Sequence, residues 1–165
     1  MNKSTEQKFD AVVAAPFGAL GVQVDETGVV SIAFLPPGTQ ARPAQTPLAE
    51  RACVQLQAYL DNPKRGFKLP LKPVGTPFQQ RVWDAIAAIP RGETLTYGDI
   101  ARELKSAPRA VGQACGRNPL PVVVPCHRVI AARGGLNGGL GGFARSGGGY
   151  LLEAKRWLLA HEGAL

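Results

Sequence analysis

The first part of the chain alternates short apolar runs with turn residues. Runs rich in Val, Ala, Leu, Ile and Phe cover residues 10–15, 18–25 and 29–35, with Pro and Gly at 16–18 and Asp and Gly within 25–28. Apolar runs of this length, bounded by such residues, are typical of strands joined by tight turns. We therefore expect three short strands in this region.

Helical spacing replaces this pattern after residue 46. Leu48, Ala52 and Leu56 recur at intervals of four, which predicts a helix over about residues 47–60. Thr46 is suited to be its N-cap, because a threonine side chain can accept a hydrogen bond from the first turn and proline is favoured at the first helical position.

Residues 63–75 are rich in Pro, Lys and Gly and interrupt both patterns. We interpret this segment as a linker between a small α+β supporting domain, residues 1–72, and a second domain, residues 73–165. The rest of the chain has the spacing of helices rather than strands.

Three helices are predicted in the first part of the second domain. One begins at residues 76–77 and carries apolar residues at helical spacing as far as residue 89, and the next covers about residues 97–104. The third begins at Arg109, after a short turn. Two short helices joined by a tight turn indicate a helix-turn-helix, although such pairs also occur in helical domains that bind no DNA.

The remaining segments have distinct compositions. Residues 119–125 are apolar with proline at both ends, which predicts an extended segment. Nine of the sixteen residues from 134 to 149 are glycine, which predicts a loop, and residues 150–161 have the spacing of an amphipathic helix. The predicted fold is α+β: a small N-terminal three-stranded sheet with a helix, then a mostly helical C-terminal domain with a helix-turn-helix.

Composition and charge narrow the class of protein. The chain has 45% hydrophobic and 19% charged residues, as globular proteins do, and a net charge of +7. Residues 1–72 hold eight Lys and Arg against six Asp and Glu, whereas residues 73–165 hold eleven against six. This basic excess suits a polyanionic partner. With no signal peptide and no apolar run long enough for a bilayer, we expect a cytoplasmic protein that binds no membrane.

Cysteine chemistry is the sharpest local feature. The three cysteines, Cys53, Cys115 and Cys126, form no C-x-x-C pair, so we expect reduced thiols and no metal site. Cys126 is followed by His127 and Arg128, and a neighbouring imidazole or guanidinium favours the thiolate that acts as a nucleophile. Taken alone, these three residues favour a buried cysteine beside a surface His-Arg pair.

The surrounding motifs favour the nucleophile. The run Pro-Cys-His-Arg-Val at residues 125–129 resembles the active-site signature of the O6-alkylguanine-DNA alkyltransferases, also called methylated-DNA–protein-cysteine methyltransferases. Segments 92–101, 109–112, 117–119 and 157–163 resemble other motifs of that family in the same order. The resemblance is close over residues 75–165 and extends to residues 9–72 in element order only.

This resemblance implies a direct-reversal DNA repair protein that moves the alkyl group of O6-alkylguanine irreversibly to its own Cys126, once per chain and without a cofactor. O4-alkylthymine is an open extension of the substrate range. His127 would activate Cys126 through a water, with Glu162 holding the imidazole. Tyr97 would protonate or hydrogen-bond the departing guanine, and Asn118 would tie the recognition helix to the active-site turn.

The resemblance also implies a partner, double-stranded DNA bound through the minor groove with the alkylguanine flipped out. Arg109 would fill the gap left by the flipped nucleotide. Further DNA contacts would come from Ala110, Gly112, Gln113, Arg117 and Arg128. The substrate pocket would be lined by Cys115, Val129, Phe143 and Ala144. The glycine-rich loop would form one pocket wall and leave room for bulky substituents such as benzyl. We expect a monomer, with cooperative assembly on DNA left open.

A departure and three alternatives follow from the same residues. Some relatives hold a zinc ion with N-terminal Cys and His residues, but this chain has only Cys53 and no histidine before His127, so we expect no such site. A relative that recognises alkylguanine without repairing it would lack Cys126. A major-groove transcriptional regulator would need a more polar recognition helix. A cysteine hydrolase would use Cys126, His127 and Glu162 and turn over repeatedly.

Overall fold

The computed structural model describes residues 9–131 and 149–165. The chain divides into two compact units, Met1–Pro73 and Val74–Leu165. Within the described residues, no helix is both long and apolar enough to cross a membrane.

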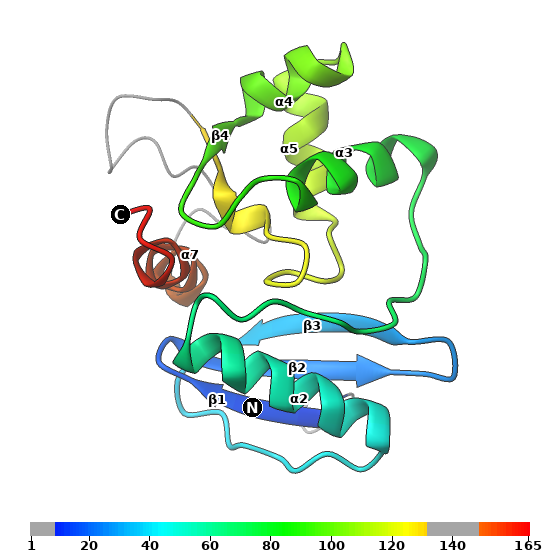
Figure 1. Ribbon diagram of the computed structural model, residues 1–165, viewed down its shortest axis with the longest axis vertical. Helices are drawn as coiled ribbons and strands as arrows, with labels where there is room; N and C mark the ends of the chain where they lie inside the picture. The colour runs from blue at the N-terminus through cyan, green and yellow to red at the C-terminus, as the bar shows by residue number, and fades with distance from the viewer. Residues whose placement is uncertain (1–8, 132–148) are drawn as a thin grey trace. The chain divides into compact units, whose positions relative to one another are not determined.

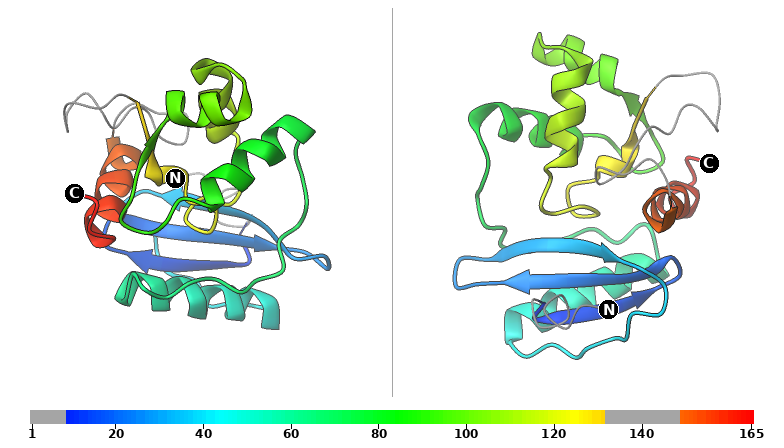
Figure 2. Two further views of the ribbon diagram at one scale, coloured as in Figure 1. Left: turned by 45° about the horizontal axis from the view of Figure 1, so that its top comes forward. Right: turned by 180° about the vertical axis from the view of Figure 1, so that it is seen from behind.

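Unit 1 is a three-stranded antiparallel sheet with one helix across a face (Figures 1 and 2). Strands β1 (Ala11–Ala15), β2 (Gly18–Val24) and β3 (Val29–Leu35) follow one another in the sheet as they do in the chain. The sequence prediction of three strands is confirmed.

Helix α2 (Pro47–Asp61) supplies the apolar layer over the sheet of unit 1. The Thr46 side chain accepts a hydrogen bond from the Ala49 amide, so the predicted N-cap is present. The helix buries one face against the strands, and its buried residues are Ala49, Ala52, Leu56, Tyr59 and Leu60.

Unit 2 is mostly helical, as predicted. It contains α3 (Pro77–Ala87), α4 (Tyr97–Leu104), α5 (Pro108–Gly116) and α7 (Gly149–His161). Thr76 and Thr96 begin α3 and α4 with capping boxes, in which the threonine side chain and the third helical residue bond each other's backbone amides. Helices α4 and α5 pack together and form the predicted helix-turn-helix (Figure 1).

A short parallel pairing in unit 2 was not predicted. Strand β4 (Leu95–Thr96) pairs with β5 (Val129–Ile130), so the start of α4 lies beside the segment that follows Cys126. Two-residue strands give no periodic signal in a sequence. This pairing brings Tyr97, the first residue of α4, to the same end of the unit as the cysteine.

The prediction of an extended segment over residues 119–125 was wrong. The Val124 amide donates to the Leu120 carbonyl at 2.8 Å, and Pro121 and Val124 bridge, so the chain turns back on itself. Val122 lies at φ 76°, which is unusual for a β-branched residue. The prolines correctly exclude a helix there, but they are also compatible with a tight turn, and a valine at positive φ carries no turn signal.

Candidate active site

Cys126 begins a single turn of 3-10 helix, η1 (Cys126–Arg128), directly after the turn at residues 120–125. Its side chain is buried, with 5% of the residue exposed. Asn118 Nδ2 lies 3.0 Å from Cys126 Sγ and 2.9 Å from the Val124 carbonyl, while Asn118 Oδ1 accepts from the Leu120 amide at 2.9 Å. A single side chain just beyond α5 therefore fixes both the turn and the sulfur.

The second cysteine of unit 2 lies against the first. Cys126 Sγ is 3.8 Å from the carbonyl oxygen of Cys115, in the last turn of α5. The hydrogen bond with Cys126 is the main cause that raises the pKa of the Cys115 thiol, and burial adds to it. Cys115 therefore remains protonated beside Cys126.

A buried ion network lies behind the cysteine. His127 Nε2 is 2.9 Å from Glu162 Oε2, and both side chains are fully buried. Arg128 donates from Nε and Nη2 to the two oxygens of Glu162, each at 2.9 Å, and from Nη1 to the Ile89 carbonyl at 2.7 Å. Glu162 thus binds two cationic or polar partners at once, as a buried carboxylate requires.

Burial sets the charge state of His127. It lowers the pKa of the imidazole, an effect that Glu162 opposes and that Arg128 and Lys155 reinforce. With Nε2–H donating to Glu162, the neutral ring keeps a lone pair on Nδ1. Among the described residues, this buried Nδ1 atom has no hydrogen-bond partner. Such a nitrogen can accept a proton through a bridging water.

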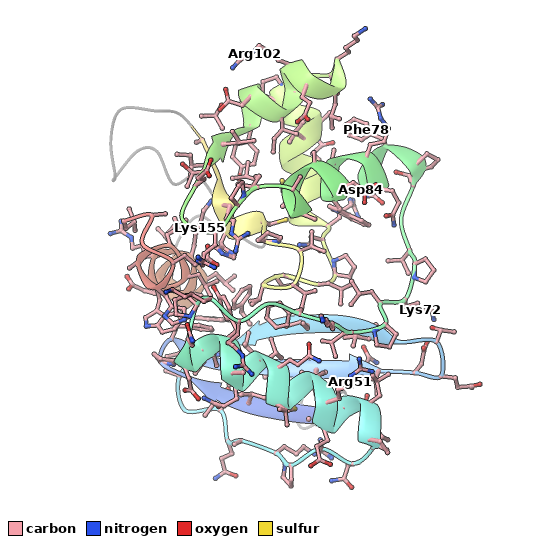
Figure 3. The ribbon with its side chains drawn as sticks, in the orientation of Figure 1. Arg51, Lys72, Phe78, Asp84, Arg102 and Lys155 are labelled. Carbon is pink, nitrogen blue, oxygen red and sulfur yellow. The ribbon has the colours of Figure 1, made fainter. Side chains whose placement is uncertain are left out.

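Lys155 is a site residue that sequence reasoning missed. It lies on α7 and is 0% exposed, with Nζ 2.8 Å from the Val129 carbonyl (Figure 3). Burial lowers the pKa of its ammonium to about 8, while Cys115 and Cys126 act in the opposite direction. The sequence signal that could have revealed it is its spacing of three and four residues from Leu158 and Leu159, which places it on the apolar face of the helix.

Tyr97 belongs to the same cluster. Burial is the main cause that raises the pKa of its phenol, and charge on Cys115 and Cys126 raises it further, because both thiols lie close to it. The phenol therefore stays protonated and can donate a hydrogen bond.

The helix-turn-helix presents an open hollow beside Tyr97. Arg109 is exposed at the start of α5 and lines this hollow, and Gly112 lines it one turn further along. A Cβ on Gly112 would meet the Tyr97 ring at an ordinary 3.9 Å, so glycine there is not required by packing. The full lining is Thr96, Tyr97, Gly98, Asp99, Arg102, Pro108, Arg109, Gly112 and Ala131.

The other predicted DNA contacts on α5 differ in exposure. Gln113 and Arg117 are exposed, whereas Ala110 is half-buried. The structure therefore leaves the two polar side chains accessible to a partner.

Two residues predicted to contact DNA or the substrate already have partners within the site. The Arg128 guanidinium bonds Glu162 and Ile89, and its side chain is 14% exposed. Val129, predicted to line the substrate pocket, donates its amide to the Cys126 carbonyl, and its own carbonyl accepts from Lys155 and keeps a second lone pair. The pairings with Glu162, Ile89 and Lys155 could not be foreseen, because these partners are 26 to 39 residues away. Phe143 and Ala144 lie outside the described residues.

The described parts of the chain, 9–131 and 149–165, contain no group of three or more His, Cys, Asp or Glu side chains suited to a metal ion. The site offers the chemistry of a thiol. A cysteine held by an amide donor, a buried His–Glu pair, a protonated phenol and a helix-turn-helix define a protein with a nucleophilic cysteine beside a DNA-binding type of helix pair.

Comparisons with known proteins agree with this class. The family model described as 6-O-methylguanine DNA methyltransferase, DNA binding domain, matches residues 77–164. A methylated-DNA–protein-cysteine methyltransferase of Methanosarcina acetivorans is 37% identical over 163 residues, covering 94% of this chain and 99% of the relative.

Solved structures give the same result. The O6-methylguanine methyltransferase of Mycobacterium tuberculosis is 35% identical and has a TM-score of 0.74, covering 93% of this chain and 91% of the other. A structure of the M. tuberculosis protein in complex with DNA has a TM-score of 0.73 at 36% identity, with the same coverage of both chains. The chain belongs to the 6-O-methylguanine DNA methyltransferase family.

Proposed function

We propose that this protein repairs DNA by transferring the alkyl group of O6-alkylguanine to Cys126, irreversibly and once per chain. The observation that carries this proposal is the buried Cys126 thiol, held by Asn118 Nδ2 at 3.0 Å beside the buried His127–Glu162 pair. The amide holds the sulfur in place, and the imidazole can take the thiol proton through a water.

The reaction is a displacement at the alkyl carbon. A bond forms from Cys126 Sγ to that carbon while its bond to guanine O6 breaks, and the product is a thioether. The thiol proton passes through a water to His127 Nδ1, and Glu162 stabilises the resulting imidazolium at Nε2. A thioether is too stable for these groups to displace, which limits the chain to one reaction.

Tyr97 assists the leaving group. Guanine leaves poorly as an anion, so a donor at the departing base lowers the barrier. The raised pKa of Tyr97 keeps its phenol protonated for that purpose. After donating, the phenol is restored by a proton from solvent or from His127.

Duplex DNA is the proposed partner, bound by α5 in the minor groove. The O6 atom is inaccessible in stacked DNA, so the nucleotide must be flipped at a cost of a few kcal/mol. Exposed Arg109, at the edge of the hollow, would fill the vacated place in the stack. The small Ala110 and Gly112 allow close approach of the helix, and exposed Gln113 and Arg117 would bind the sugar-phosphate walls.

Further properties belong to the same proposal. Residues 73–165 would carry DNA binding and alkyl transfer, and residues 1–72 would support them. The protein would act as a monomer in the cytoplasm, where thiols stay reduced. O4-alkylthymine would be a second substrate, and a pocket wall formed by the glycine-rich segment, with Phe143 and Ala144, would admit a benzyl substituent.

The test is intact mass after mixing the protein with duplex DNA that contains one O6-methylguanine. We expect a single gain of about 14 Da, at most one per chain, and none in Cys126→Ala. Cys53→Ser is the matched control and should react like the wild type. Binding without a mass gain would favour a recognition protein, and repeated turnover of an ester would favour a hydrolase.

A duplex with O4-methylthymine and a free O6-benzylguanine probe extend the same measurement. A mass gain of about 14 Da with the first would establish the second substrate. Failure of the benzyl probe with a protein that repairs O6-methylguanine would exclude the roomy pocket.

A further inference from the structure

Two cysteine side chains from different elements meet in the site. Cys115 ends α5, Cys126 begins η1, and Cys126 Sγ lies 3.8 Å from the Cys115 carbonyl oxygen. The Cys126 side chain raises the pKa of the Cys115 thiol, which requires the two side chains to be close, and neither cysteine forms a disulfide. A disulfide joins sulfurs about 2.05 Å apart, so the two side chains must rotate toward each other to form one.

We propose that Cys115 is a resolving cysteine, which closes a reversible disulfide with Cys126 after a hydroperoxide has oxidised Cys126. The disulfide is a modification of the proposed acceptor, and the co-reactant is a small hydroperoxide such as hydrogen peroxide. Its value rests on the proposed function, because a nucleophile used only once is wasted if it is oxidised irreversibly.

The chemistry balances in two steps. The Cys126 thiolate attacks one peroxide oxygen, the S–O bond forms, the O–O bond breaks, and the second oxygen leaves as alcohol or water after taking a proton. The Cys115 thiolate then attacks the sulfur of the sulfenic acid, the S–S bond forms, and the hydroxide leaves as water with the Cys115 proton. Two thiols are oxidised by two electrons, and the hydroperoxide is reduced by two.

The surroundings of the pair favour this order of events. The Cys126 side chain is the main cause that raises the pKa of Cys115, and burial is the second. Oxidation of Cys126 to a neutral sulfenic acid removes the electrostatic effect of Cys126 on Cys115. Lys155, which acts to lower the pKa of Cys115, remains in place. Cys115 is therefore easier to deprotonate after Cys126 is oxidised than before.

Other groups around the pair do not compete for this role. Among the described residues, Tyr97 from α4 and Lys155 from α7 are ionisable groups that interact electrostatically with both cysteines. Neither side chain carries a sulfur. Cys115 is the cysteine that the structure places in contact with Cys126 Sγ.

The experiment uses the full chain without DNA. After brief treatment with excess hydrogen peroxide, intact mass should fall by about 2 Da, and a thiol reductant should restore it. Trypsin cuts after Arg109, Arg117 and Arg128, so the two cysteines fall on separate peptides, 110–117 and 118–128. A nonreduced digest should contain these two peptides joined.

Variants separate the resolving role from general oxidation. Cys53→Ser should behave like the wild type. Cys115→Ser and Cys115→Ala should instead gain about 32 or 48 Da, which a thiol does not reverse. Reduction after peroxide should recover alkyl transfer in the wild type and in Cys53→Ser, and in neither Cys115 variant. If neither Cys115 variant shows a cooperative melting transition, the peptide map of the wild type still decides whether the disulfide joins Cys115 to Cys126.

Two outcomes would overturn the proposal. The wild type could gain about 32 Da without any joined peptides, or the joined peptides could contain Cys53. Failure of the proposed function is distinguishable, because a protein that forms the disulfide but takes no alkyl group from DNA refutes alkyl transfer alone.

Discussion

The side chain of Lys155 is fully buried, and its Nζ lies 2.8 Å from the Val129 carbonyl. Its ammonium interacts electrostatically with both thiols of the site. A positive charge near Cys126 favours its anionic form, and one such interaction at an effective dielectric near 20 amounts to about 1–4 kcal/mol. We predict that Lys155→Met, which keeps an unbranched side chain one atom shorter, slows the reaction of Cys126 about tenfold at pH 7. The rate of Cys126 alkylation by iodoacetamide tests this without DNA, and the rate of transfer from a methylated duplex tests it with DNA.

The control for this prediction is the pH dependence of the reaction rates of the wild type and Lys155→Met. The pKa of Lys155 is lowered to about 8, so the wild type carries the charge below that pH and loses it above. The rate difference between wild type and Lys155→Met should therefore be full at pH 7 and narrow as the pH rises past about 8. An equal ratio of rates at pH 7 and pH 10 would show that the variant acts by altered packing instead.

At the scale of elements, α5 begins without a capping side chain. Its N-cap is Ala107, an exposed residue in extended conformation, and alanine has no oxygen to bond the first turn. We predict that Ala107→Ser and Ala107→Asp each raise the free energy of unfolding by about 0.5–1 kcal/mol, measured by urea denaturation. If the start of α5 faces phosphates, Ala107→Asp should nevertheless bind duplex DNA several-fold more weakly than Ala107→Ser. Equal DNA binding by the two variants would place this end of α5 away from the backbone.

The helices and strands could be predicted from the sequence, whereas the contacts between distant segments could not. Strands and helices such as Gly18–Val24 and Pro47–Asp61 follow from local periodicity and caps. The β4–β5 pairing, the turn at Val122 and the salt bridge from Arg128 to Glu162 depend on contacts between distant segments. The site residues Cys126, His127, Glu162 and Asn118 were found through family motifs. Lys155 was missed, because a buried cation and an exposed one look alike in a sequence.

At the scale of the whole molecule, the proposed reaction should weaken the unit in which it occurs. Cys126 is 5% exposed, so an added methyl group must displace its neighbours, and overpacking of this kind costs about 1–3 kcal/mol. Conversion of the thiol to a thioether also crowds the sulfur that accepts from Asn118 Nδ2 and removes the S–H donor that faces the Cys115 carbonyl. Three effects therefore act in the same direction, and all of them fall within residues 74–165.

We predict that the alkylated protein melts several degrees lower than the same protein incubated with unmethylated duplex. Amide hydrogen exchange should accelerate in α5 and in the Arg128 and Val129 amides, which bond within the 125–129 segment, and should stay unchanged in β1, β2 and β3. An unchanged melting temperature would mean that the site accommodates the methyl group without overpacking.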